Sequence, residues 1–232
     1  TIGDGEVVLN VLADELSKHC DGKGKFNPDR LFASVRELHN RLQGAFSDCA
    51  YIIGKGMLAF RARYGIRPLC LGMKKFPDGS VNYMVASESV AIEGLGYEFL
   101  RDIKPGEAVF IDKNQELFSQ MCFDEPKLNP CVFEYVYIAR PDSTLDGINV
   151  YAARLKFGEY LGKEVLKNIA KDEIDVVMPI PDSGRPAAQQ LAASLNLPYR
   201  EGFIKNRYVG RTFIMPGQEA QIQLNRIGIN IF

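Results

Sequence analysis

Residues 174–188, IDVVMPIPDSGRPAA, join an apolar run to a short polar turn and then to helix-forming residues. The apolar part, 174–180, is flanked by charge and predicts a buried parallel strand. The polar turn carries Asp182, Ser183 and Gly184, and a helix is predicted over 187–195. Ligands of open α/β sheets bind at the carboxyl ends of strands, and helix N-termini favour anions, so this turn is a candidate phosphate site. The alternative is a plain strand-to-helix turn in which Ser183 caps the helix and nothing binds.

Residues 202–217, GFIKNRYVGRTFIMPG, carry three cations with glycine and aromatic residues among them. No helix or strand period explains this spacing. Guanidinium groups match phosphate oxygens, glycine permits unusual backbone angles, and aromatic faces can stack on a base. The pattern predicts a basic loop that closes over a phosphorylated, nucleotide-like ligand, and a solvated basic loop is the alternative.

The elements around these two stretches predict an α+β fold followed by an α/β fold. In the second half, a helix over 152–170 and a strand over 199–204 indicate the start of a doubly wound parallel sheet. In the first half, amphipathic helices are predicted over 5–19 and from Asn27-Pro28 to about Gly44, and a short helix near 89–95. Mainly antiparallel strands are predicted over 50–53, 57–61, 69–73, 83–87, 108–111 and 116–121.

The run 124–130, DEPKLNP, holds two prolines and no apolar cluster. We interpret it as a linker between domains at 1–125 and 126–232.

Composition excludes several classes of protein. The net charge of −1 gives no whole-chain field for nucleic acid or an anionic membrane, and the apolar runs are too short to span a bilayer. The first six residues, TIGDGE, have neither the basic nor the apolar region of a signal peptide. The five cysteines form no CxxC pair or zinc spacing, which favours reduced thiols and a cytoplasmic location.

Several motifs carry a resemblance to a known family. FEYVYIARPDS (133–143), PIPDSGRPAA (179–188) and IKNRYVGRTFIMPGQ (204–218) resemble glutamine phosphoribosylpyrophosphate amidotransferases, also called amidophosphoribosyltransferases. RARYGIRP (61–68), YMVASESV (83–90) and Asp4-Gly-Glu6 resemble the later part of the glutaminase domain of that family. The resemblance covers residues 1 to about 218, and the tail 219–232 departs from the family pattern.

The resemblance implies two domains with separate chemistry. The first would be the later part of an N-terminal-nucleophile, class II glutamine amidotransferase that releases ammonia from glutamine. The second would be the start of a type I phosphoribosyltransferase, where ammonia displaces pyrophosphate from phosphoribosylpyrophosphate with Mg²⁺. The product, phosphoribosylamine, is that of the committed step of purine biosynthesis. Members of this family pass ammonia through a channel, are inhibited by purine nucleotides, and form homo-oligomers.

The resemblance also implies roles for individual residues. Asp4 would bind the α-amino group of glutamine, although it also suits a helix N-cap. Ser183 would make the Mg²⁺ and substrate contact in a pyrophosphate loop that includes Asp182 and Gly184. The mobile loop that closes over phosphoribosylpyrophosphate, where Lys205 also touches nucleotide inhibitors, would hold Lys205, Arg207, Tyr208, Gly210 and Arg211.

The chain also departs from the family. The family's glutaminase begins with a nucleophilic cysteine, whereas residue 1 here is threonine. The Asp-Asp-Ser phosphoribosylpyrophosphate motif would follow residue 232. We therefore expect an internal fragment with no catalytic residue of its own and no activity alone. The alternatives are a non-catalytic regulatory protein that binds purine nucleotides or phosphoribosylpyrophosphate, and a related phosphoribosyltransferase with another nucleophile.

Other residues give weaker signals. Cys131 stands where some family members have an iron–sulfur ligand, but a neutral cysteine at the domain seam is the preferred interpretation. His19 and His39 are expected on helix surfaces or ends. A substrate patch or a solvated sheet edge would account for Arg61, Arg63 and Arg67.

Overall fold

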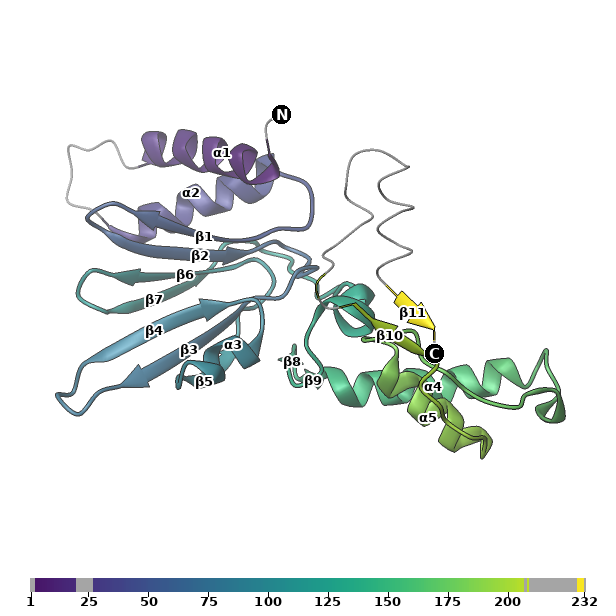
Figure 1. The fold of residues 1–232 in the computed structure, drawn as a ribbon. Coiled ribbons are helices and arrows are strands. Elements are labelled where there is room, and N and C mark those ends of the chain that lie inside the picture. Colours follow the sequence, from purple (N-terminus) through teal and green to yellow (C-terminus); the bar gives the residue numbers. More distant parts are fainter. Residues whose placement is uncertain (1–2, 20–26, 207, 209–228, 232) are drawn as a thin grey trace. The chain divides into compact units, whose positions relative to one another are not determined.

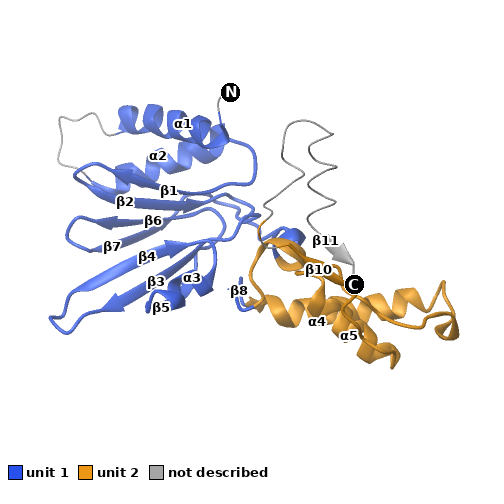
Figure 2. Ribbon diagram, viewed as in Figure 1, with its two compact units in different colours: residues 1–134, 142–147 blue, residues 135–141, 148–232 orange. Residues whose placement is uncertain are grey.

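The computed structural model describes residues 3–19, 27–206, 208 and 229–231. The chain forms two compact units, coloured in Figure 2. Unit 1 comprises Thr1–Glu134 and Asp142–Gly147, and unit 2 comprises Tyr135–Pro141 and Ile148–Phe232. These units are defined by contacts alone, so the functional domains 1–125 and 126–232 stay a prediction.

Unit 1 is a stack of four layers (Figure 1). Helices α1 (Asp4–His19) and α2 (Pro28–Arg41) cover one face of an antiparallel sheet of order β1-β2-β6-β7. Its strands are β1 (Ser47–Ile52), β2 (Gly56–Arg61), β6 (Glu107–Asp112) and β7 (Leu117–Met121). A second antiparallel sheet, of order β4-β3-β5, packs on the other face. Its strands are β3 (Cys70–Lys75), β4 (Val81–Ala86) and β5 (Glu98–Asp102), and helix α3 (Ser89–Gly94) contacts all three. The antiparallel strands predicted for the first half are confirmed, and β5 was not predicted.

Unit 1 has hydrophobic cores on both faces of its first sheet, because side chains alternate between the faces along each strand. Leu58 and Phe60 of β2 face the helices, whereas Ala59 between them faces the second sheet. Strand β6 is likewise buried on both faces. In the second sheet Leu71 faces the first sheet, and at the next residue, Gly72, an added Cβ would lie 2.3 Å from Ile92 of α3.

Local sequence explains the helices of unit 1. The side chain of Asn27 accepts a hydrogen bond from the Asp29 backbone N–H at 2.8 Å, and Pro28 occupies the first turn of α2, as predicted. Leu31, Val35 and Leu38 recur at helical spacing and are fully buried.

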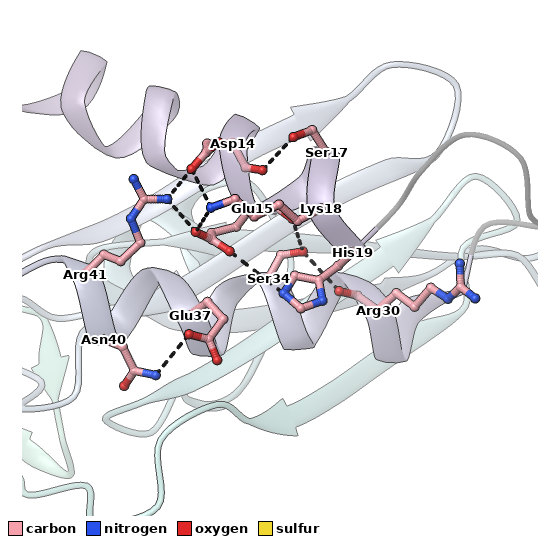
Figure 3. Close-up of polar contacts among 10 residues, drawn as sticks. All are labelled: Asp14, Glu15, Ser17, Lys18, His19, Arg30, Ser34, Glu37, Asn40 and Arg41. Atoms are coloured by element: carbon pink, nitrogen blue, oxygen red, sulfur yellow. Dashed lines mark hydrogen bonds and ion pairs between the residues drawn. The ribbon is translucent and has the colours of Figure 1, made fainter.

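A charged network also joins α1 to α2 (Figure 3). The buried carboxylate of Glu15 is paired with Lys18 at 2.9 Å and with Arg41 of α2, and Asp14 pairs with the same two cations. Hydrogen bonds from Lys18 and then Arg41 lower the pKa of Glu15. The pairing keeps a buried carboxylate ionised between two helices.

Arg61 is internal, and neither a substrate patch nor a solvated edge describes it. Its side chain is 1% exposed, and its guanidinium makes five hydrogen bonds. Two of these, at 2.7 and 2.8 Å, go to the carboxylate of Asp146. The other three go to the backbone carbonyls of Gly65, Arg67 and Ile103. A guanidinium has five N–H groups, so each one is satisfied.

The predicted linker 124–130 is part of unit 1. Backbone N–H groups of Lys127, Asn129 and Cys131 donate to the carbonyls of Arg63, Tyr64 and Ile66. The prolines have no N–H; Pro126 precedes the first of these donors and Pro130 lies between the last two. These hydrogen bonds fix the run within unit 1, and its role as a linker between functional domains stays a prediction.

His39 is buried, contrary to the surface position predicted for it. Its ring stacks on Phe46, with the centroids 5.8 Å apart, and meets Phe60 and Phe123 edge-on. Neither ring nitrogen has a hydrogen-bond partner. Burial, with Arg63 and Arg36 nearby, lowers the pKa of His39 from 6.5 to about 4.

Unit 2 is built on a close helix pair. Its helices are α4 (Val150–Val165) and α5 (Arg185–Leu195), with a 3-10 turn η2 (Lys171–Glu173) between them. A Cβ added at Gly158 of α4 would lie 2.2 Å from the carbonyl oxygen of Ala187, so only glycine permits this approach. Strands β10 (Phe203–Lys205) and β11 (Ile229–Ile231) pair antiparallel. The short strands β8 (Thr144–Leu145) and β9 (Ile148–Asn149) belong to unit 1 and unit 2 respectively.

A buried arginine also orders the start of unit 2. Arg154 of α4 donates from Nε to the carbonyl of Tyr135 and from Nη2 to that of Ala139, both at 2.7 Å. These bonds hold Tyr135 within η1 (Glu134–Ile138), a single π-helical turn, and Ala139 directly after it.

The predicted parallel sheet is absent from the described part of unit 2. Residues 174–180 form no strand, and a single parallel bridge joins Val177 to Tyr199. Met178 and Ile180 remain 46% and 59% exposed. A central strand becomes buried only between two neighbours, and the described residues supply one partial neighbour. No helix in the described ranges is both long and apolar enough to cross a membrane.

We expect Asp146→Asn to lower the free energy of unfolding by about 3 kcal/mol, because it leaves the buried charge of Arg61 without its carboxylate. Asparagine tolerates the left-handed backbone of residue 146, where φ is 49°, so the backbone is not the cause. Urea unfolding followed by circular dichroism measures the loss. Asp124→Asn is the control, since Asp124 is 85% exposed in its pair with Arg36 and should cost under about 1 kcal/mol. Equal effects of the two variants would contradict this account.

Gly158→Ala should destabilise unit 2 by about 1–3 kcal/mol, because its methyl group collides with backbone that cannot move independently. Gly162→Ala, one turn further along α4, is the control. There the added Cβ lies 3.4 Å from Leu191, which is ordinary contact, so alanine should be neutral or stabilise by up to about 1 kcal/mol. Thermal unfolding of the two variants tests the difference, and a stabilised Gly158→Ala protein would refute it.

Acid should destabilise the protein through His39. Its pKa is lower in the folded state than in the unfolded chain, so protons bind the unfolded state more strongly. The stability is complete above about pH 6.5 and falls as the pH drops toward 4, by about 2 kcal/mol between pH 7 and pH 5. His39→Phe removes this titration within an aromatic cage. Unfolding free energies at both pH values should show a smaller acid loss for the variant, and an unchanged loss would be the contrary result.

Candidate functional site

The polar turn 181–184 connects the Val177 bridge to helix α5. Gly184 is the N-cap residue of α5, and no side chain caps this helix, so Ser183 does not act as its cap. A Cβ at Gly184 would lie 2.8 Å from the carbonyl oxygen of Ile180, which explains the glycine. The peptide bond between Pro181 and Asp182 is cis.

Arg185 is the charged centre of the site. Its Nη1 lies 2.9 Å from Oδ1 of Asp182, and its Nε lies 3.2 Å from the carboxylate of Glu201. The hydroxyl of Tyr199 donates to Glu201 at 2.7 Å. Burial and the hydrogen bond to Glu201 raise the pKa of Tyr199 to about 12, so the phenol stays protonated as a donor. Four side chains from two segments thus form one hydrogen-bonded chain.

Sequence reasoning missed Glu201, the partner of Arg185 on the 199–201 segment, and Tyr199, which donates to Glu201. The sequence did contain a signal for this pair: Tyr199 and Glu201 stand two residues apart in an extended run, so their side chains lie on the same face. What sequence did not contain was the bridge that brings Tyr199 beside Val177.

The residues predicted to bind phosphoribosylpyrophosphate fall in two groups. Asp182, Ser183 and Gly184 lie together in the polar turn. Lys205 ends strand β10 and is exposed, with Ile229 as its strand partner, and Tyr208 is 99% exposed. The predicted residues Arg207, Gly210 and Arg211 lie outside the described residues.

The oxygen groups of the polar turn are of the kind that Mg²⁺ prefers. Ser183 has no hydrogen-bond partner within the described ranges, whereas the carboxylate of Asp182 is engaged by Arg185. No three potential ligands of the His, Cys, Asp or Glu type gather anywhere in the described part of the chain. The turn thus offers the oxygen groups of Asp182 and Ser183 but no complete set of protein ligands for a metal ion among the described residues.

Two other predicted site residues lie in unit 1. Asp4 is the first residue of α1 and is exposed. Cys131 is half-buried with a free thiol, and its backbone N–H donates to Ile66. The preference for a plain cysteine over a cluster ligand stays a prediction.

Arginines of the RARYGIRP motif also have defined partners in unit 1. Arg67 lies 2.7 Å from the buried carboxylate of Glu134. Burial raises the pKa of Glu134, and Arg67 opposes that shift. Arg63 stacks on the rings of Tyr64 and Phe123, at 5.1 and 5.4 Å.

Comparison with curated proteins finds relatives along the whole chain. Amidophosphoribosyltransferases of Pasteurella multocida, Escherichia coli and Saccharomyces cerevisiae are 48%, 47% and 43% identical to it. Each match covers 99% of this chain but 45% of the relative, so the chain spans about half the length of the relatives it matches. No protein-family model matches the sequence.

Solved structures give the same result. Glutamine phosphoribosylpyrophosphate amidotransferase of B. subtilis, complexed with ADP and GMP, is 33% identical with a TM-score of 0.73 over 99% of this chain and 45% of its own. A structure described as the allosteric regulatory enzyme of purine biosynthesis is 34% identical with a TM-score of 0.75, over 100% and 45%. The resemblance inferred from the motifs is confirmed. The matches cover 99–100% of the chain, and the divergence expected for the residues of the tail 219–232 stays a prediction.

Proposed function

We propose that this chain is a segment of an amidophosphoribosyltransferase. The protein that contains it would hydrolyse glutamine with water to glutamate and ammonia and transfer the ammonia to phosphoribosylpyrophosphate, which gives phosphoribosylamine and pyrophosphate. In that transfer a bond forms between the ammonia nitrogen and C1 of the ribose, the bond from C1 to the pyrophosphate oxygen breaks, and the nitrogen releases one proton to solvent. The segment would hold parts of both catalytic domains.

The observation that carries this proposal is the continuity of the match. Each relative aligns with 99% of the chain at 43–48% identity, so both compact units correspond to one enzyme. The structural likeness supports the same conclusion, since it also extends over both units. A protein that shared only a nucleotide-binding half would match over one unit.

In unit 2, the polar turn would receive the pyrophosphate group of the substrate. No side chain caps the start of α5; the Arg185 N–H donates to the carbonyl of Asp182 and Pro186 has no N–H, so the other N–H groups of the first turn are the ones that would favour an anion. Ser183 would hold Mg²⁺, which supplies charge neutralisation to the leaving pyrophosphate. Lys205 and Tyr208 would belong to the loop that closes over the substrate, together with Arg207, Gly210 and Arg211. Closure would exclude water that competes with ammonia.

In unit 1, Asp4 would bind the α-amino group of glutamine. Its carboxylate is exposed and stands at the start of α1, so a substrate ammonium can reach it. Unit 1 would thus contribute to the glutamine site, while the nucleophile would be supplied from elsewhere in the protein.

Regulation and assembly follow from the same proposal. Purine nucleotides would act as feedback inhibitors, in keeping with the ADP and GMP bound to the B. subtilis relative. We propose a cytoplasmic homo-oligomer with a channel for ammonia. Cys131 would be a plain cysteine rather than an iron–sulfur ligand.

The test uses the complete protein that contains this segment, assayed with phosphoribosylpyrophosphate, Mg²⁺ and either glutamine or ammonia. Asp4→Asn should lower the glutamine-dependent rate by about tenfold or more and leave the ammonia-dependent rate intact, because only glutamine needs the carboxylate. Ser183→Ala should lower both rates, because both use the phosphoribosyl site.

Asp29→Asn is the control for Asp4→Asn, since Asp29 is an exposed acid in the first turn of α2. It should leave both rates unchanged. A complete protein that binds purine nucleotides but forms no phosphoribosylamine from either nitrogen source would favour the regulatory binding protein instead.

A further inference from the structure

The guanidinium of Arg185 is held on two sides and open on the third. Asp182 binds Nη1 and Glu201 binds Nε, while Nη2 has no partner among the described residues. The Arg185 side chain is 39% exposed, so this open edge is accessible to solvent. A planar guanidinium fixed by two carboxylates presents its remaining N–H groups in one defined direction.

The carboxylate of Glu201 is itself fixed. It accepts a hydrogen bond from the hydroxyl of Tyr199, and Tyr199 is anchored by its bridge to Val177. Backbone bonds on both sides of this bridge, from Val177 to Pro198 and from Arg200 to Val177, hold the two segments together. The position of Arg185 is therefore set by the segment 199–201 as well as by its own helix.

This network contributes little to stability. Asp182 and Glu201 are 51% and 38% exposed, and ion pairs that are open to water contribute roughly 0–1 kcal/mol each. Its main effect is on geometry and charge at the polar turn. Two carboxylates surround one cation there, so the group carries a net negative charge. An arriving pyrophosphate, also anionic, would compete with them for the guanidinium.

We propose that Arg185 binds the pyrophosphate group of the substrate through its open edge, and that Glu201 both positions Arg185 and limits its attraction for phosphate. This inference rests on the proposed function, because it names a further binding residue at the same turn. Removing the charge of Arg185 weakens phosphate binding. Removing the charge of Glu201, with its shape kept, strengthens it.

The experiment measures KM for phosphoribosylpyrophosphate, kcat, and inhibition by pyrophosphate in the complete protein. Arg185→Gln should raise KM by about tenfold, the size expected for a lost charged hydrogen bond, with a smaller change in kcat. Arg185→Lys should recover part of the loss, because it keeps the charge but not the planar fork. Glu201→Gln should lower KM by about twofold to fivefold at low salt, and this gain should shrink at high salt.

Matched controls come from α4, where Glu159 and Lys163 form an exposed pair 3.1 Å apart. Lys163→Gln and Glu159→Gln make the same charge changes on a neighbouring helix and should leave KM unchanged. An unchanged KM in Arg185→Gln would overturn the proposal. Equal increases of KM in Arg185→Gln and Glu201→Gln would also overturn it, because they would show that Glu201 only positions Arg185 and does not limit its attraction for phosphate.

Calorimetric titration with pyrophosphate and Mg²⁺ separates this inference from the proposed function. If the complete protein makes no phosphoribosylamine, the proposed function fails, and the inference is judged by pyrophosphate affinity alone. Weaker binding to Arg185→Gln and tighter binding to Glu201→Gln would support it. Equal binding to the wild-type protein and both variants would refute it.

Discussion

Unit 1 depends on one buried cation. Arg61 ends strand β2, and its five hydrogen bonds reach the loop at Gly65 and Arg67, the carbonyl of Ile103 before β6, and Asp146. A charge with 1% exposure is tolerable only when every N–H group has a partner, so these segments must meet at one point. The meeting of these segments also requires glycine at residue 65. Its backbone has a left-handed φ of 54°, and a Cβ there would approach Pro105 and the guanidinium of Arg61.

Buried arginines also fix the run 133–143 and the residues after it, with Arg154 acting in unit 2 and Arg61 in unit 1. Arg154 binds the carbonyls of Tyr135 and Ala139 within unit 2. In unit 1, the chain at 142–147 is held by Asp146 on Arg61, by Ser143 on Glu88, and by the Thr144 N–H on Ser89. The chain therefore alternates between the units at 134, 141 and 147, and each short stretch is fixed inside its own unit. The motif 133–143 is thus continuous in sequence, but its residues belong to two different units.

The polar turn shows how much of a candidate site is local. Its glycine, its serine and its place before a helix were all evident in the sequence, because a strand-to-helix turn is defined by neighbouring residues. The pairing of Arg185 with Glu201 was not evident, because the two meet across sixteen residues through the bridge between Val177 and Tyr199. The same distinction explains His39, whose helix was predicted but whose burial comes from Phe60 and Phe123 on other elements.

Sequence alone determined the helices, most antiparallel strands, the motifs of the family and the composition of the polar turn. These follow from periodicity, capping and turn chemistry, which act over a few residues. Tertiary structure decided which polar groups were internal and which apolar runs were covered. It made Arg61 internal rather than a surface charge, bonded the backbone of 127–131 to residues 63–66, and left 174–180 half exposed. Burial depends on neighbours distant in the chain, and no local pattern specifies them.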